Sequence, residues 1–260
     1  MPDLALPSTP AMDASADRAP ARARRFVRLS EMDAAWINRE MHLHTSWTDG
    51  TPTIAEVIDR AEALGLEEIA FTEHVRADSA WFPAFAAEVR AAAAGRAVRV
   101  LVGAEVRITD FEGSLDITPA QRRECDVVLA SVHRFPGADG TPIEFASVPR
   151  EAFAETELAL ALGFLRRGGA DVLAHPGGMS QRQLGGFPDE MYRLLARASR
   201  AAGVAIEISA SYLPDVGGFL ALLRDDDPFV SVGSDAHTLD ELGRCRDILR
   251  QHPWPARLSS

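Results

Sequence analysis

Histidine and acidic side chains recur along this chain at spacings that suit metal binding. His42 and His44 stand two residues apart, and Asp235 and His237 repeat that spacing far down the sequence. Residues i and i+2 of a strand face the same side, so each pair would present both side chains to one site. Further candidate ligands lie between the two pairs: Asp49, His74, Glu105, His133 and His175.

A single histidine at the end of a strand is usually a structural residue, but nine metal-binding groups in one place are a different case. Burying these groups together without a cation would be costly, and divalent cations remove that cost. Nine ligands exceed the four of a structural zinc site and suit two or three metals with open positions. The imidazoles favour zinc, iron or manganese over magnesium or calcium.

Seven short apolar segments, alternating with helical patterns, must position these groups. Strands are expected at 38–43, 67–72, 98–104, 126–132, 171–174, 204–209 and 229–233. Helices are expected at 54–65, 81–94, 151–167, 188–202 and 217–223, with another after Thr238. This alternation predicts a parallel sheet covered by helices, and seven units point to a closed or nearly closed barrel. The candidate ligands lie at strand ends that converge on one face of such a barrel.

Length and composition limit the remaining possibilities. The chain has 260 residues and a formal net charge of −11, which argues against a protein that coats nucleic acid nonspecifically. No apolar run is long enough for a membrane span, and the two distant cysteines, Cys125 and Cys245, suit a cytoplasmic location. Residues 1–25 are expected to be a disordered tail, and residues 26–260 a single catalytic domain.

Six motifs, taken in order, resemble the PHP (polymerase and histidinol phosphatase) family. They are MHLHTSWTDG, FTEH, GAEV, SVH, AHP and SDAH, spread over about residues 38–250. The resemblance implies an α/β fold, a distorted (β/α)7 barrel with the metal site at the C-terminal ends of the strands. It also implies a division of the ligands among three metals: His42, His44, Asp235 and Glu105 for the first, the bridging Glu105 with His133 and His175 for the second, and Asp49, His74 and His237 for the third.

Three acidic positions vary within the family or have a role other than metal binding. Some family members carry His at the position of Asp49. Glu73 stands where the family more often has Asp, and it is a candidate for orienting a ligand or for proton transfer. Glu207 matches an acidic position that is expected to contact the metal ligands without binding the metal itself.

Two or three close divalent cations are well suited to phosphate ester hydrolysis, with a metal-activated hydroxide as the nucleophile. Asp235 and Glu73 are the catalytic candidates, and Asp235 or a water on the third metal would protonate the leaving group. Arg134, Arg76 and Arg182 are candidates for gripping the phosphate oxygens, the last from a glycine-rich loop.

The leading hypothesis is a phosphomonoesterase acting on a small phosphorylated metabolite, of the histidinol phosphate or nucleotide type. The alternatives are a phosphodiesterase or exonuclease acting on nucleic acid, and a non-catalytic, metal-stabilised PHP module. The lack of a basic stripe argues against the first alternative, and nine competent ligand positions argue against the second.

Overall fold

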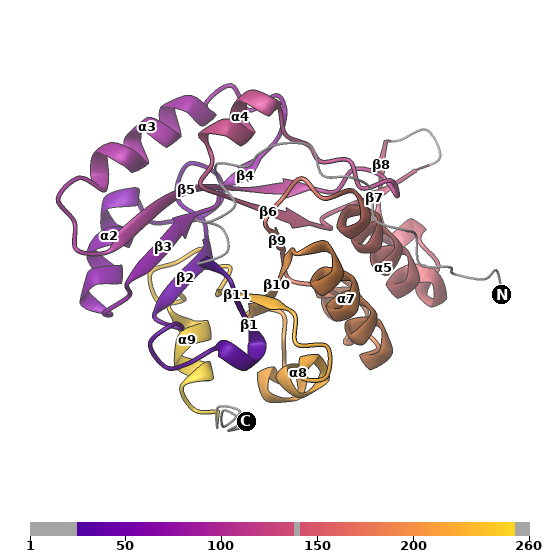
Figure 1. Ribbon diagram of the computed structural model, residues 1–260. Helices are drawn as coiled ribbons and strands as arrows, with labels where there is room; N and C mark the ends of the chain where they lie inside the picture. The colour runs from indigo at the N-terminus through magenta and orange to yellow at the C-terminus, as the bar shows by residue number, and fades with distance from the viewer. Residues whose placement is uncertain (1–24, 138–140, 253–260) are drawn as a thin grey trace.

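A parallel sheet surrounded by helices forms the body of the molecule (Figure 1), and the computed structural model describes residues 25–137 and 141–252. Seven parallel strands follow one another in the spatial order β11-β10-β9-β6-β5-β3-β2. They are β2 (Arg39–Leu43), β3 (Glu68–Phe71), β5 (Arg99–Arg107), β6 (Val127–Ser131), β9 (Val172–Leu173), β10 (Ala205–Ser209) and β11 (Phe229–Gly233). Each of the seven predicted strands is thereby confirmed, with small shifts at the ends.

The two edges of this sheet meet at a seam between β2 and the chain that follows β11. Leu43 forms a parallel bridge with Ala236, the His44 amide donates to the Ala236 carbonyl at 2.8 Å, and the Ala236 amide donates to the His42 carbonyl at 3.2 Å. Gly233 permits this approach, because a Cβ there would lie 2.6 Å from the Cβ of His42. The sheet therefore closes at its carboxyl end into the expected distorted barrel.

The side chain of Glu40, on β2, also bridges this seam. Its Oε1 accepts the Ser234 amide at 2.6 Å, and its Oε2 accepts the Gly243 amide, just before α9 (Arg244–Leu249), at 3.1 Å. Burial raises the pKa of Glu40 to about 7. A fully buried carboxyl group thus accepts backbone amides from the chain after β11, where the first and last strands of the barrel meet.

Apolar side chains fill the barrel interior below the candidate ligands, which lie at the carboxyl ends of the strands. This cluster comprises Phe26, Met41, Ala70, Leu101, Val127, Leu129, Val172, Ala174 and Ala205. Phe26 lies before the first strand that the sequence predicted. It directly precedes β1 (Val27–Arg28), which pairs antiparallel with β11. The interior is therefore a packed core, and the open face lies at the carboxyl ends of the strands.

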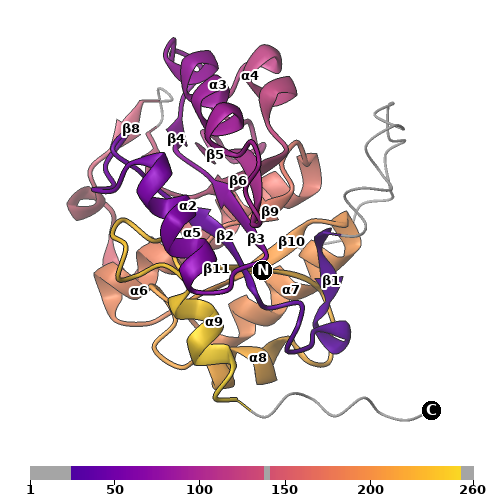
Figure 2. The ribbon, with the colours of Figure 1, turned by 90° about the vertical axis from the view of Figure 1, so that its left-hand side faces the viewer.

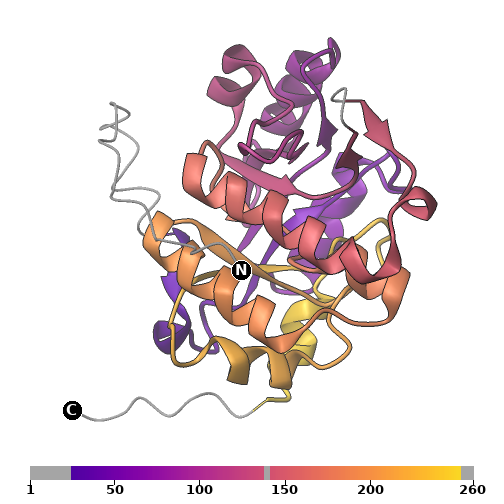
Figure 3. The ribbon, with the colours of Figure 1, turned by 90° about the vertical axis from the view of Figure 1, so that its right-hand side faces the viewer.

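The main helices pack around the outside of the sheet (Figure 2), and α5 and α7 lie side by side over one flank (Figure 3). They are α2 (Ile54–Ala63), α3 (Phe82–Ala92), α5 (Arg150–Arg167), α7 (Asp189–Ala202), α8 (Val216–Leu223) and α9. All of them were predicted. The sheet face beneath them and their inner faces form one large apolar layer.

Several short elements were not predicted. They are η1 (Leu29–Glu31), β4 (His74–Val75), α4 (Pro119–Glu124), the hairpin of β7 (Phe135–Pro136) and β8 (Pro142–Ile143), η2 (Phe145–Ser147) and α6 (Gly178–Leu184). Helix α6 corrects the prediction that Arg182 lies in a loop. Gly177 and Gly185 adopt left-handed backbone angles as the caps of this helix, so the glycines bracket a helical segment instead of loosening it.

Two predictions concern parts of the chain at or beyond the described residues. The tail predicted for 1–25 lies outside them except for Arg25, and the single-domain assignment for 26–260 stays a prediction. No helix among the described residues has the length and apolar character needed to cross a membrane.

Candidate metal centre

The nine candidate ligands meet at the carboxyl end of the barrel, where parallel pairing brings the strand ends together. Among the described residues, nitrogen and oxygen atoms form overlapping groups in which all atoms lie within 4.8 Å of one another. The groups are His42, His44 and Asp235; His42, Glu105 and His175; His74, Glu105 and His133; and His44, Asp49, His74 and His237. The fold thus gathers every side chain that the sequence nominated as a ligand.

Glu105, on β5, lies at the centre of this cluster. Its Oε1 is 3.0 Å from His133 Nε2 and 2.8 Å from His175 Nε2, while its Oε2 is 2.8 Å from His74 Nδ1. Burial alone would raise the pKa of Glu105, but His133 and His42 lower it well below its usual value. An ionised carboxylate with a different set of imidazoles at each oxygen can bridge two cations.

Asp235 approaches the first histidine pair from the loop after β11. Its Oδ1 lies 3.1 Å from His44 Nε2 and 3.4 Å from His42 Nε2. Burial would raise the pKa of Asp235, but the charge of His42 and a hydrogen bond from His44 lower it strongly. The backbone at Asp235 has φ of 49°, a strained value for a residue with a side chain. Such strain, about 1–3 kcal/mol, is characteristic of functional sites.

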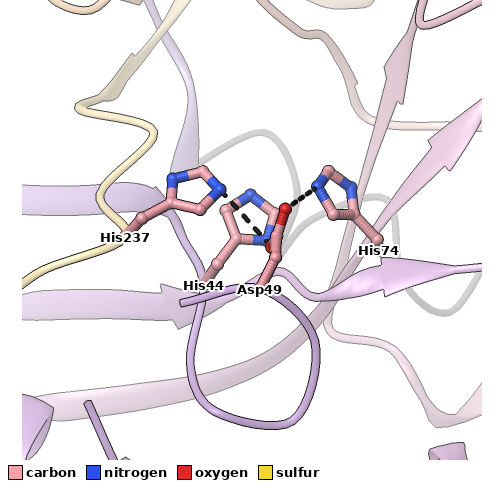
Figure 4. Close-up of side chains that lie close together, drawn as sticks. All are labelled: His44, Asp49, His74 and His237. Carbon is pink, nitrogen blue, oxygen red and sulfur yellow. Dashed lines mark ion pairs between the residues drawn. The ribbon is translucent and has the colours of Figure 1, made fainter. Parts of the chain in front are cut away.

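Asp49 organises the outermost group, in which its carboxylate lies among three imidazoles (Figure 4). Its Oδ2 is 3.3 Å from His74 Nε2, and its Oδ1 is 3.4 Å from His237 Nε2 and 3.9 Å from His44 Nδ1. The Asp49 side chain is 54% exposed, whereas the His44 side chain is fully buried. This group is therefore the part of the cluster that is most accessible from solvent.

Contacts at the second ring nitrogen orient the imidazoles of His42 and His237. His42 Nδ1 lies 2.9 Å from Glu207 Oε1, so its Nε2 faces the cluster. The other Glu207 oxygen accepts the His175 amide at 2.6 Å. His237 Nδ1 lies 2.9 Å from the Asp235 carbonyl oxygen, which leaves its Nε2 for the pocket. Pairing the second ring nitrogen in this way is typical of metal-ligating histidines.

The protonation of the two opening histidines differs sharply. Burial would lower the pKa of His42, but the carboxylates of Glu207, Glu105 and Asp235 raise it well above its usual value. Burial dominates at His44 and lowers its pKa to about 4. The site therefore mixes charged and neutral imidazoles around strongly acidic carboxylates, a balance that a bound cation would displace toward neutral imidazole ligands.

Buried imidazole nitrogens without hydrogen-bond partners indicate that the cluster is suited to binding cations. Within the described part of the chain, His42 Nε2 and His44 Nδ1 are buried and have no hydrogen-bond partner. Leaving such an atom unsatisfied costs about 1–3 kcal/mol, and both nitrogens face carboxylates at distances beyond normal hydrogen bonds. Imidazole nitrogens and carboxylate oxygens are the donors that zinc, manganese and iron accept.

Glu73 is buried beside this centre but points toward the loop that carries Asp49. Its Oε1 accepts the Thr45 amide at 2.8 Å and the Thr45 hydroxyl at 2.5 Å, and its Oε2 accepts the Thr48 hydroxyl. Burial raises the pKa of Glu73. With both oxygens engaged by the loop, Glu73 is well placed to hold the loop. The role of Thr45 and Thr48 was missed, although both stand in the first motif.

The three candidate phosphate-gripping arginines are all exposed. The Arg134 guanidinium lies 5.9 Å from the centre of the Phe145 ring, and the Arg182 guanidinium lies 4.3 Å from the centre of the Tyr212 ring. Tyr212 in turn stacks on His175, with ring centres 4.5 Å apart. The Arg76 amide donates to the Ser79 hydroxyl at 3.0 Å. Tyr212 thus contacts both Arg182 and the candidate ligand His175.

Trp47 belongs to the packing of the loop and not to the open pocket. Its ring lies 5.8 Å from Trp81 and 5.9 Å from Phe85, and its Nε1 donates to Glu88 on α3 at 3.1 Å. These contacts anchor the loop between His44 and Asp49 to the outside of the barrel.

Known proteins share both sequence and fold with this chain. The model of the PHP domain family, described as "PHP domain", matches residues 40–211, a stretch that includes all of the clustered ligands except Asp235 and His237. A "Probable phosphatase" of Pectobacterium atrosepticum is 26% identical over 233 residues, which cover 83% of this chain and 86% of that protein. A second "Probable phosphatase", from Edwardsiella ictaluri, is 28% identical over 225 residues, 81% of this chain and 83% of its own length.

A solved structure shows the same fold. The crystal structure of the "putative histidinol phosphatase hisK" of Listeria monocytogenes aligns with a TM-score of 0.61 at 16% sequence identity. The alignment covers 79% of this chain and 97% of the other.

Proposed function

This chain belongs to the PHP domain family and is a phosphoesterase, and we propose that it hydrolyses a phosphate monoester of a small metabolite. The observation that carries the proposal is the gathering of imidazoles and carboxylates around Glu105, which lies within 3.0 Å of three histidine nitrogens. Both relatives carry the name "Probable phosphatase", which favours a monoester. Histidinol phosphate and nucleotides are the substrate types that the sequence suggested.

Two or three divalent ions, zinc, manganese or iron, are the cofactor in this proposal. His42, His44, Asp235 and Glu105 would hold the first, and Glu105, His133 and His175 the second. Asp49, His74 and His237 would hold a third on the accessible side. When bound, the ions would lower the pKa of a water and neutralise the phosphoryl oxygens.

The residues of the chain prepare the site in distinct ways. Glu207 fixes the ring of His42, and Glu73 holds the loop that presents Asp49. Of the two roles that the sequence suggested for Glu73, ligand orientation and proton transfer, we propose the first, because both of its oxygens accept hydrogen bonds from this loop. Asp235, whose oxygen faces two imidazoles, is proposed as a ligand that would also take the proton of the attacking water and pass it to the departing alkoxide. Arg134 and Arg76, from loops, and Arg182, from α6, would bind the phosphate oxygens.

The location of the enzyme is proposed from its thiols. Cys125 and Cys245 are both buried in the core, and two such distant cysteines fit the reducing cytoplasm that the sequence suggested.

The decisive experiment combines elemental analysis with substrate comparison. Wild type should contain zinc, manganese or iron and hydrolyse a chromogenic phosphate monoester faster than the matching diester or single-stranded DNA. His42→Ala should lose metal and at least about 100-fold in kcat/KM, because the first metal loses a ligand. His252→Ala, which removes a histidine that is not in the cluster, is the matched control.

Two outcomes would contradict the proposal. Full monoesterase activity in His42→Ala without bound metal would reject the metal mechanism. Preferential cleavage of the diester or of DNA would reject the monoester assignment and favour a nuclease.

A further inference from the structure

Glu157 is a buried carboxylate on α5 that the proposed chemistry does not use. Only 3% of the residue is exposed, and it faces the first turn of α6. Its Oε1 accepts the Met179 amide at 3.0 Å, and its Oε2 accepts the Ser180 amide at 2.7 Å and the Ser180 hydroxyl at 2.5 Å. Three donors from one short segment therefore converge on this single side chain.

Through these contacts, a residue of α5 acts as the N-cap of α6. The N-cap of α6 is Gly177, which has no side chain to accept hydrogen bonds. An N-cap side chain normally accepts the second or third amide of its helix, and Met179 and Ser180 occupy these positions. Glu157 thus supplies the missing cap from α5, and its negative charge suits the positive end of the helix.

The capped turn begins at His175, a candidate ligand in a strained conformation. His175 has φ of 27°, and its amide donates to Glu207 at 2.6 Å. The Gly178 amide donates back to the His175 carbonyl at 2.8 Å. A Cβ on Gly178 would come within 2.7 Å of the Tyr212 ring, so the turn passes tightly under that ring. Strained backbone persists only where surrounding contacts impose it.

Two carboxylates therefore hold this segment, one at each end. Glu207 holds the entry at His175, and Glu157 holds the exit at Met179 and Ser180. Beyond the exit, α6 carries Arg182 to the ring of Tyr212, and the same ring stacks on His175. Displacing the start of α6 would move both the ligand and the arginine.

We propose that Glu157 is a positioning residue, which fixes His175 as a metal ligand and Arg182 at the mouth by capping α6. This inference rests on the proposed metal-dependent phosphatase function. A purely structural role for Glu157 predicts something different, namely a loss of global stability with unchanged metal affinity in the folded protein.

The test compares Glu157→Gln with Glu62→Gln in the full-length protein. Glu62 also accepts a backbone amide, that of Ala97 at 2.7 Å, but it contacts none of the clustered ligands. Both proteins are stripped of metal and titrated with Mn²⁺ and with Zn²⁺, and amide hydrogen exchange at residues 175–182 is followed without metal. Steady-state kinetics on the chromogenic monoester at saturating metal then separate kcat from KM.

Glu157→Gln presents an NH₂ group to amide donors, so exchange at Met179 and Ser180 should accelerate at least about tenfold, and metal affinity should fall about 10- to 100-fold. KM should rise because Arg182 moves, and kcat should fall because His175 moves. Ser180→Ala removes only the hydroxyl contact and should give a smaller change of the same kind. It supplies a second measurement if Glu157→Gln folds poorly.

Metal affinity and exchange in Glu157→Gln equal to those of Glu62→Gln would overturn the inference. If wild type binds metal but hydrolyses no monoester, the proposed function fails, while the affinity and exchange data still decide whether Glu157 positions His175.

Discussion

At the scale of single residues, the site depends on side chains that never need to touch substrate. Glu207 joins two candidate ligands, because one oxygen faces His42 Nδ1 and the other accepts the His175 amide. The other ring nitrogen of His42, Nε2, faces the cluster and lies 3.4 Å from Asp235 Oδ1. One buried carboxylate therefore sets the direction of one ligand and the backbone of another.

Replacing Glu207 with Gln should reduce kcat/KM and metal affinity about 10- to 100-fold, because the amide cannot accept from both His42 and His175. Metal titration and monoester kinetics measure the two effects. Glu124→Gln, which changes an exposed carboxylate that pairs with Arg90 far from the cluster, is the control. Wild-type metal affinity in the Glu207 variant would show that His42 is oriented by other contacts.

At the scale of elements, the seam between β2 and β11 leaves no space for a side chain at Gly233. A Cβ on Gly233 would lie 2.1 Å from Glu207 Oε1 and 2.6 Å from the His42 Cβ. The closure of the sheet and the alignment of the first ligand are therefore set by the same glycine.

Gly233→Ala should destabilise the protein by about 1–3 kcal/mol, as overpacking does in a buried site. It should also weaken metal binding, because the new methyl group displaces His42 or Glu207. Urea unfolding and metal titration are the measurements. Gly186→Ala is the matched control, since a Cβ at that position meets no atom within 4 Å. Equal stability of the two variants would mean that the seam tolerates a wider separation.

A second contact between elements makes stability depend on pH. Asp116 accepts the Ala77 amide at 3.0 Å and Arg107 Nη2 at 2.6 Å, joining the loop after β4 to β5. Burial would raise the pKa of Asp116, but these hydrogen bonds lower it below 3.8, the ordinary value. The contribution of Asp116 to stability is therefore present above pH 3.8 and is lost as pH falls through the lower pKa of the folded state.

Asp116→Asn should accordingly be less stable than wild type near pH 7, by up to about 1 kcal/mol for a partly exposed pair. The difference should shrink as the pH is lowered below about 4. Urea unfolding at pH 7, 5, 4 and 3.5 measures it, with the exposed Asp225→Asn as the control. A difference that stays constant over this range would exclude an ionised Asp116 as its source.

At the scale of the whole molecule, the candidate ligands connect segments separated by almost two hundred residues. His42 comes from the first strand of the barrel and Asp235 from just after the last, and they lie on either side of the seam. Cations bound between them would link the two edges of the sheet, so metal binding and folding should be coupled.

Removing metal with a chelator should therefore lower the melting temperature. At a metal concentration 100 times Kd, binding contributes about 2.7 kcal/mol, which corresponds to roughly 5–10 °C for a domain of this size. Calorimetry with and without EDTA measures the shift, and His42→Ala should show a smaller one. An unchanged melting temperature in wild type would indicate that the cluster holds no metal in solution.

The sequence alone determined the seven strands, the main helices and the set of side chains that meet at one face. These are consequences of local patterns, because apolar runs form buried strands and parallel strands must present their carboxyl ends on the same side. His44 and His175 could be placed there from their position after a strand. The order of the motifs was enough to identify the family.

Only the tertiary structure decided how these side chains are held. Glu157 lies 23 residues from the hydroxyl that it binds, and Glu40 lies 194 residues from the Ser234 amide. Helix α6 was read as a loop for the same reason, since its cap comes from α5 and not from its own glycine. Such contacts join residues that share no periodic pattern, so no local rule in the sequence specifies them, and they arise only when packed elements meet.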